Sequence, residues 1–319
     1  MKRYFYILFA ISVLSLTLNS NADENPTIEI LNYSKIPTET ILSWTNFGAS
    51  KLSDWQADTL GIFYNIGKEV RKGKIDIHPF NSHRVILSQD QIKEIENSIV
   101  RYIEEGNCAD YRVEESKYMI EDIVRWISGG ADIATAPDPC FHRRMVLYAQ
   151  TSEQSNKTAQ QIWLHEFYHA HSNYLQTYCI NPNNPEYIQD ENREKYEDGR
   201  WFGEATAEYF GFMVTEEMNG NSDPVSKMLK EGRVSAKKEG KSIYDNFASN
   251  SAVALRLIIE RGKIQVSEND IMSASVFHSC DWPDKWNRKF SDEIAFVQDN
   301  WYKISKENGS WVFSESVLK

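Results

Sequence analysis

The chain has 319 residues, a formal net charge of −11 at pH 7 and 41% hydrophobic residues. This composition provides enough apolar side chains for a sizeable core, and the length permits one large domain or two modest ones. An acidic chain is poorly suited to binding nucleic acid through its phosphates, so we expect no nucleic-acid partner.

Residues 1–22 have the pattern of a secretory signal peptide. Lys2 and Arg3 precede an apolar run that ends near Leu18, and small residues lead up to Ala22 as a signal peptidase prefers. The apolar run is short for a spanning helix, and no later segment is apolar for long enough to cross a bilayer. We expect cleavage after Ala22 and a periplasmic or secreted bacterial protein without stable membrane insertion. An uncleaved anchor is the alternative.

Residues 23–150 alternate short strands with helices. Segments 28–31 and 84–87 have the composition of strands. Apolar stripes predict three helices with core positions, over 54–66, from the Ser88-x-x-Gln91 capping box through Ile99, and over 119–127 before a Gly-Gly pair.

Segment 144–149 is predicted to be a strand directly before the main motif of the chain. If it is an edge strand, its free backbone groups could pair with an extended peptide by strand addition. A plain structural strand is the alternative.

His165, Glu166 and His169 form the pattern HExxH in a segment with a helical sequence. Thr158-x-x-Gln161 has the form of a capping box, and no proline interrupts the segment up to Tyr178. On a helix the two histidines are one turn apart and project the same way, so they can bind one zinc ion with Glu166 beside it as general base. The alternative is an ordinary amphipathic helix whose two histidines share a face.

A catalytic zinc site needs a third protein ligand and one position for water. Segment 201–211 is predicted to be helical and has Glu204 and Glu208 one turn apart. Two acids among apolar and small residues are hard to explain as a solvent face, so we expect one of them to bind the metal. Three small residues on the same side would let another helix come close: Gly203, Ala207 and Gly211.

The segments that follow the zinc motif carry weaker signals. Residues 186–198 are polar and acidic, which indicates a solvated excursion, and 219–241 are predicted to be a loop and an exposed helix. Apolar density predicts buried helices over 251–261 and 292–304. Four tryptophans could line a substrate groove, but core positions are the usual outcome for this residue: Trp282, Trp286, Trp301 and Trp311.

The chain has four cysteines, Cys108, Cys140, Cys179 and Cys280. In an oxidising compartment an even number favours disulfides over metal ligation here, because no spacing is CxxC. Three pairings are possible, and we favour Cys108–Cys140 with Cys179–Cys280.

The HExxH and Glu-x-x-Ala patterns together resemble the gluzincin metallopeptidases, the group that includes thermolysin and the zinc aminopeptidases. The resemblance covers about residues 144–215 and implies Glu204 as the third zinc ligand and Glu208 as the acid that orients a histidine ligand. Two features depart from that group. The 34 residues between His169 and Glu204 exceed the usual spacing, and the aminopeptidase exopeptidase motif has no match.

The resemblance also implies a mechanism. Zinc would polarise the scissile carbonyl and activate a water molecule, and Glu166 would pass the proton of that water to the leaving amine. A tyrosine or histidine commonly stabilises the oxyanion in these enzymes. Tyr244, in a Tyr-Asp pair loosely similar to an aminopeptidase motif, and His278 are the candidates, with a packing role as the alternative for each.

The sequence therefore predicts an α+β protein. A mixed strand and helix part with an edge strand, residues 23–150, would precede a mainly helical, zincin-like catalytic part, residues 151–319. We expect an exported peptidase that needs Zn2+ and acts on peptide or protein substrates. The alternative is a catalytically inactive, peptidase-like binding protein in which zinc is structural or absent.

Overall fold

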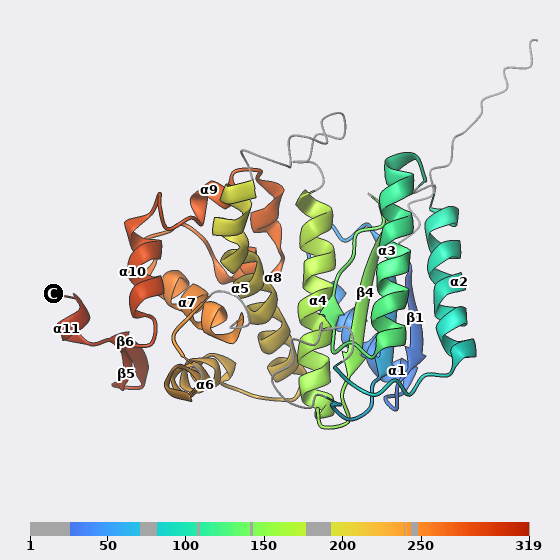
Figure 1. Cartoon of the computed structure of the whole chain (residues 1–319). Coiled ribbons are helices and arrows are strands. Elements are labelled where there is room, and N and C mark those ends of the chain that lie inside the picture. Colours follow the sequence, from blue (N-terminus) through green and yellow to red (C-terminus); the bar gives the residue numbers. More distant parts are fainter. Residues whose placement is uncertain are drawn as a thin grey trace, which may run out of the picture.

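The computed structural model describes residues 26–70, 82–106, 109–140, 143–176, 193–238, 240–243 and 248–318. Several predictions fall outside these residues and stay predictions: the signal peptide, Cys108, Cys179, Tyr244 and most of the polar segment 186–198. The chain is a mixed α and β protein in which a small sheet lies beside a helical C-terminal half (Figure 1). The general α+β prediction is confirmed.

A four-stranded mixed sheet organises the N-terminal half. Its strand order is β1-β2-β4-β3, with β1, β2 and β4 parallel and β3 antiparallel to β4. The strands span Ile28–Tyr33 (β1), Asp58–Asn65 (β2), Ala134–Thr135 (β3) and Arg143–Gln150 (β4). The strands predicted over 28–31 and 144–149 are confirmed.

Strand β4 is internal to the sheet, so the prediction of an edge strand is wrong for this segment. Met145 N donates to Pro137 O at 3.2 Å and Ala149 N donates to Ile133 O at 2.8 Å. The segment around β3 therefore covers the side of β4 that faces away from β2, and the sheet edges are β1 and β3.

Two further predictions for the N-terminal half are wrong. The segment 54–66, predicted to be a helix, contains strand β2. A helix that was not predicted, α1 (Thr38–Ala49), precedes it. A parallel strand that is buried on both faces is apolar at successive positions. Its sequence therefore lacks the alternation of apolar and polar residues that identifies a strand. The strand predicted over 84–87 is irregular. Arg84 shares backbone hydrogen bonds with Gly67 and Lys68, and the pairing there is an isolated bridge between Glu69 and His83.

Alternate residues of each inner strand point to opposite sides of the sheet. Both sets are largely apolar, so helices cover both faces. On one face, Ile62 and Leu147 pack in a core with α2 (Gln89–Glu105) and α3 (Ala109–Gly129). The predicted capping box of α2 is present, since Ser88 and Gln91 exchange side-chain and backbone hydrogen bonds. On the other face, the larger core joins the sheet to α1, to α4 (Asn156–Gln176) and to the C-terminal helices.

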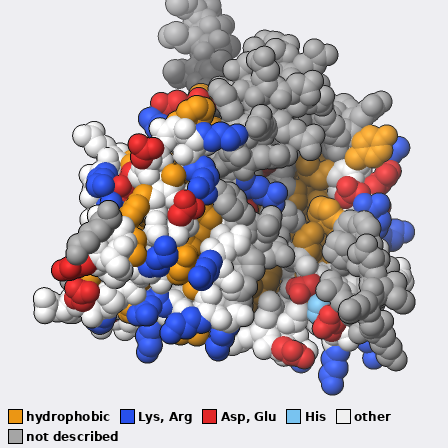
Figure 2. All heavy atoms as spheres, turned by 60° about the vertical axis from the view of Figure 1, so that its left-hand side comes forward, with side chains coloured by type: hydrophobic (Ala, Val, Ile, Leu, Met, Phe, Trp, Pro, Cys, Tyr) orange, Lys and Arg blue, Asp and Glu red, His pale blue; other side chains and the backbone are white. Residues whose placement is uncertain are grey.

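The C-terminal half is mainly helical, as predicted. Helix α4 stands between the sheet and α5 (Arg193–Met218) (Figure 1). The other elements are α6 (Pro224–Lys238), α7 (Ala248–Arg261), α8 (Glu268–Met272), η4 (Ser275–His278), α9 (Trp282–Lys285), α10 (Asp292–Asn300), β5 (Ile304–Glu307), β6 (Ser310–Phe313) and α11 (Glu315–Leu318). Trp282, Trp286 and Trp301 are buried, which agrees with a core role. Figure 2 shows acidic and basic side chains interspersed on one face of the molecule.

Cys140 and Cys280 are both disulfide-bonded, and no described cysteine is free. Their predicted partners lie outside the described residues, so the pairing stays a prediction. No described helix combines the length and hydropathy needed to span a bilayer.

Candidate metal centre

Helix α4 begins one turn earlier than its sequence predicts. Ser155 Oγ accepts a hydrogen bond from Thr158 N at 3.1 Å, so Ser155 caps the helix and Thr158 lies inside it. The uninterrupted helix then places His165 and His169 one turn apart on the same side. Their Nε2 atoms are 3.1 Å apart.

Helix α5 packs along α4, and Gly211 lies directly against the α4 backbone. A Cβ atom at Gly211 would lie 2.6 Å from Gln161 O and 3.1 Å from His165 N. Only glycine fits against the α4 backbone at this distance. Ala207 is fully buried, but a Cβ at Gly203 would meet no atom within 4 Å. The predicted close contact is therefore confirmed for Gly211 and wrong for Gly203.

The close approach brings Glu204 to the two histidines. Glu204 Oε2 lies 3.4 Å from His165 Nε2 and 3.6 Å from His169 Nε2. Donor atoms of a tetrahedral zinc ion with bonds of about 2.0–2.2 Å lie roughly 3.3–3.6 Å from one another. The separations of 3.1, 3.4 and 3.6 Å thus match the size of a zinc site. These three residues form the group in the described part of the chain that could hold a metal ion.

Glu208 contacts the opposite side of the His165 ring. Its Oε2 lies 3.1 Å from His165 Nδ1, and its Oε1 accepts a hydrogen bond from Gln161 Nε2 at 2.7 Å. A carboxylate at this position favours the tautomer that carries its proton on Nδ1, which leaves the Nε2 lone pair free for a metal. Gln161 is predicted from the sequence only as part of a capping box, although it lies one helical turn before His165 on the same face.

The acids and the histidines of this group shift one another's pKa values. Burial lowers the pKa of His165, but hydrogen bonds with Glu204 and Glu208 outweigh burial and raise it to about 10. Burial raises the pKa of Glu204, but its hydrogen bonds with both histidines hold the pKa well below its usual range. Without metal, the acids therefore stabilise a protonated imidazole. A metal ion must displace that proton, so metal affinity should fall as the pH falls.

Glu166 lies beside the two histidines. It makes no hydrogen bond to any other residue that the structure describes, so its carboxylate is free to act on a ligand. Burial raises the pKa of Glu166, while the neighbouring His165 and His169 oppose this shift. A carboxylate with a raised pKa is better matched to accepting and returning a proton near neutral pH.

The structure places one of the two candidates for oxyanion stabilisation. His278 Nε2 lies 3.2 Å from Asp54 Oδ2, and the His278 side chain is 43% exposed. Among the described residues, His278 has no hydrogen bond or ion pair with His165, His169 or Glu204. Its proposed role stays a prediction, as does that of Tyr244.

Comparison of the chain with protein-family models, with curated proteins and with solved structures finds no match. A function can therefore be assigned only from the residues of this chain and their geometry.

Proposed function

We propose that the chain is an exported, zinc-dependent peptidase that hydrolyses bonds in peptide or protein substrates. The observation that carries the proposal is the convergence of the side chains of His165, His169 and Glu204, with donor atoms 3.1 to 3.6 Å apart. Two of these residues flank Glu166 in an HExxH pattern. A structural metal site has no need of an adjacent free carboxylate, whereas a hydrolytic site needs one as a base.

The resemblance to gluzincin metallopeptidases supports the same assignment. In that group a glutamate on a second helix is the third ligand, and the acid one turn later orients a histidine. Glu204 and Glu208 face opposite nitrogens of His165, which fits this division of roles. We also propose that the helical half is zincin-like, as this resemblance implies.

The chain's own residues would act in three ways. His165, His169 and Glu204 would hold the zinc ion, which when bound supplies Lewis-acid activation of water and of the scissile carbonyl. Glu166 would take a proton from the attacking water and deliver it to the leaving amine. Glu208 and Gln161 would keep the His165 ring in the orientation and tautomer that this site requires.

A zinc assay combined with a peptide-library digest tests the proposal. We expect one zinc ion per purified chain and cleavage of library peptides that stops when the metal is removed. The double variant His165→Ala, His169→Ala should lose both zinc and cleavage. Peptide binding by the zinc-loaded chain without any cleavage would support the binding-protein alternative instead. Stoichiometric zinc in the double variant would place the metal site elsewhere.

Export is tested separately by sequencing the amino terminus of the mature protein. We expect it to begin at Asp23, as cleavage after Ala22 requires. A mature protein that begins at Met1 would support the uncleaved anchor.

A further inference from the structure

A cavity lies where the parallel strands end, and its lining contains none of the residues of the metal centre. Its volume is about 600 Å³. The chain segments that follow β1, β2 and β4 all contribute to its lining, together with the irregular segment that contains Arg84. Crevices outside the carboxyl ends of parallel strands are a usual place for ligands in open α/β sheets, and this volume suits a small molecule.

The charge of this cavity differs from that of the whole chain. Lys35, Lys68 and Arg84 line it, and its described lining contains no aspartate or glutamate. No described acidic side chain lies within ion-pair distance of these three cations. In a chain with a net charge of −11, three cations from separate segments that share one cavity form a local reversal of sign.

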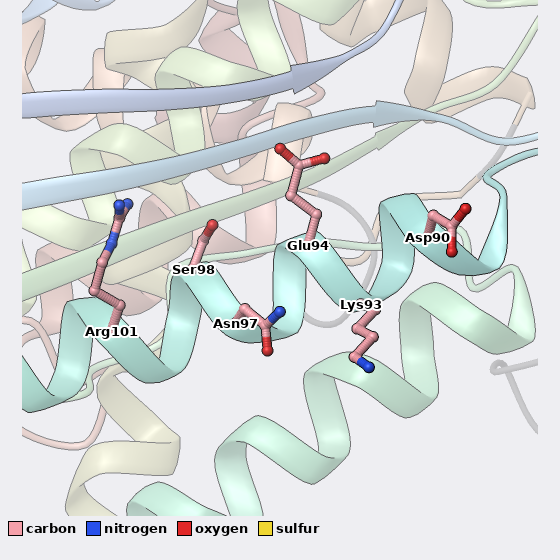
Figure 3. A pocket seen from close by; sticks show the side chains of 6 residues that line it. All are labelled: Asp90, Lys93, Glu94, Asn97, Ser98 and Arg101. Atoms are coloured by element: carbon pink, nitrogen blue, oxygen red, sulfur yellow. The ribbon is translucent and has the colours of Figure 1, made fainter.

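A second pocket of the N-terminal half shows the contrast. The shallow pocket on α2 is lined by Lys93 and Arg101 but also by Asp90 and Glu94 (Figure 3). Arg101 is already paired there with Glu29 of β1 at 2.9 Å. The cations of that pocket are therefore balanced by acids, whereas those at the strand ends have no acidic partner among the residues that the structure describes.

Neutral groups in the cavity are also suited to an anion. Gln154 Oε1 accepts hydrogen bonds from Tyr148 Oη at 2.8 Å and from Thr151 N at 3.0 Å. The oxygen of this amide is thereby occupied, and its NH2 group is left as a donor. Asn156, the first residue of the long helix α4, lies in the same lining and adds the positive end of the helix dipole.

An apolar wall completes the cavity. Ile36 and Ile66 are buried, and Ile86 is 52% exposed although it is apolar. A ligand with an apolar part would cover Ile86, and a bare inorganic ion would not.

We propose that this cavity binds a small molecule that carries an oxyanion next to an apolar group. A phosphate ester and a carboxylate share this chemistry. The dianionic phosphate is favoured, because three cations that have no acidic partner in the described part of the chain can each contribute to its binding.

Titration calorimetry with phenyl phosphate and with benzoate tests this site. The full chain is used after treatment with a chelator, so that no anion can bind at the metal centre. We expect 1:1 binding, tighter for phenyl phosphate, that weakens as salt is added. Tighter binding of benzoate would identify a carboxylate as the ligand, and the proposed location of the site would stand.

The double variant Lys35→Gln, Lys68→Gln should bind phenyl phosphate at least tenfold more weakly. The control variant Lys93→Gln, Lys237→Gln changes the net charge equally at two other exposed lysines and should bind within twofold of the unmodified chain. All four side chains are exposed, so both variants should keep the unfolding temperature of the parent. Absence of binding by both probes, or equal weakening in the two variants, would overturn the proposal.

Discussion

Oε2 of Glu208 lies 3.1 Å from Nδ1 of His165, on the side of the ring opposite to the Nε2 atom that faces Glu204. The two glutamates are one turn apart on α5, yet they meet different nitrogens of the same histidine. This arrangement supports the proposal that Glu204 binds the metal ion and that Glu208 orients His165.

Glu204→Gln and Glu208→Gln should therefore differ in zinc affinity. Glu204→Gln removes the charge of the proposed third ligand, so we expect the larger loss of both zinc affinity and activity. Glu208→Gln changes the partner of His165 Nδ1 and leaves the three proposed ligands in place, and a loss of about 10–100-fold in affinity or activity is typical for such a change. Competition with a chromophoric chelator measures both affinities. If Glu208→Gln loses the metal while Glu204→Gln keeps it, the third ligand is Glu208.

Gln161→Leu should reproduce part of the Glu208→Gln effect, because Gln161 holds the second oxygen of Glu208 at 2.7 Å. We expect a smaller loss of zinc affinity than in Glu208→Gln. The two substitutions act through one hydrogen-bonded chain, so their effects on zinc affinity should not add in the double variant. Full additivity in the double-mutant cycle would show that Gln161 does not act through Glu208.

Gly211→Ala and Gly203→Ala form a matched pair on α5. A Cβ at Gly211 would approach the α4 backbone to 2.6 Å, and overpacking of this kind costs about 1–3 kcal/mol of stability. Gly203 has open space around it, so Gly203→Ala should stabilise the chain by about 0.5–1 kcal/mol through helix propensity alone. Urea unfolding measures both. Gly211→Ala should also weaken zinc binding, because its nearest neighbours include His165.

The sequence predicted the features of this protein that depend on local spacing. His165 and His169 on one face of α4, and the capping box of α2, follow from residues within one or two turns of a helix. The strand β2 was missed because its burial on both faces comes from helices that are distant in sequence. For the same reason the sequence could not predict the contacts of Gly203, Gly211 and Gln161. Which small residue of α5 meets α4, and which amide reaches Glu208, depends on where the two helices cross.

Glu216 offers a prediction about stability and pH. Its side chain is 3% exposed, and it forms ion pairs with Lys157 of α4 at 2.7 Å and with Lys227 of α6 at 2.6 Å. Glu216→Gln should destabilise the chain by about 1–3 kcal/mol. This is less than the roughly 3–5 kcal/mol for breaking a fully buried ion pair, because both lysines are more than a third exposed.

The pH dependence of this effect follows from the pKa of Glu216. Burial raises that pKa, but the hydrogen bonds from Lys157 and Lys227 outweigh burial and lower it in the folded chain. The folded chain then holds the proton less tightly than the unfolded chain does, so the stabilisation is complete above a pH of about 4.5 and is lost as the pH falls below it. The difference in unfolding free energy between the parent and Glu216→Gln should therefore shrink between pH 7 and pH 3.5. A difference that is constant over this range would contradict the role given to the two lysines.

Glu166→Gln tests the proposed base separately from the proposed metal ligands. The substitution keeps the shape of the side chain and removes its ability to accept a proton, while His165, His169 and Glu204 are unchanged. We expect one zinc ion per chain as before, with loss of at least a hundredfold in peptide cleavage, since general-base catalysis contributes roughly 10²–10⁴-fold. Glu153→Gln, at an exposed position before α4, is the control and should cleave peptides at the parental rate. A Glu166→Gln chain that binds zinc and still cleaves peptides at the parental rate would show that Glu166 is not the base.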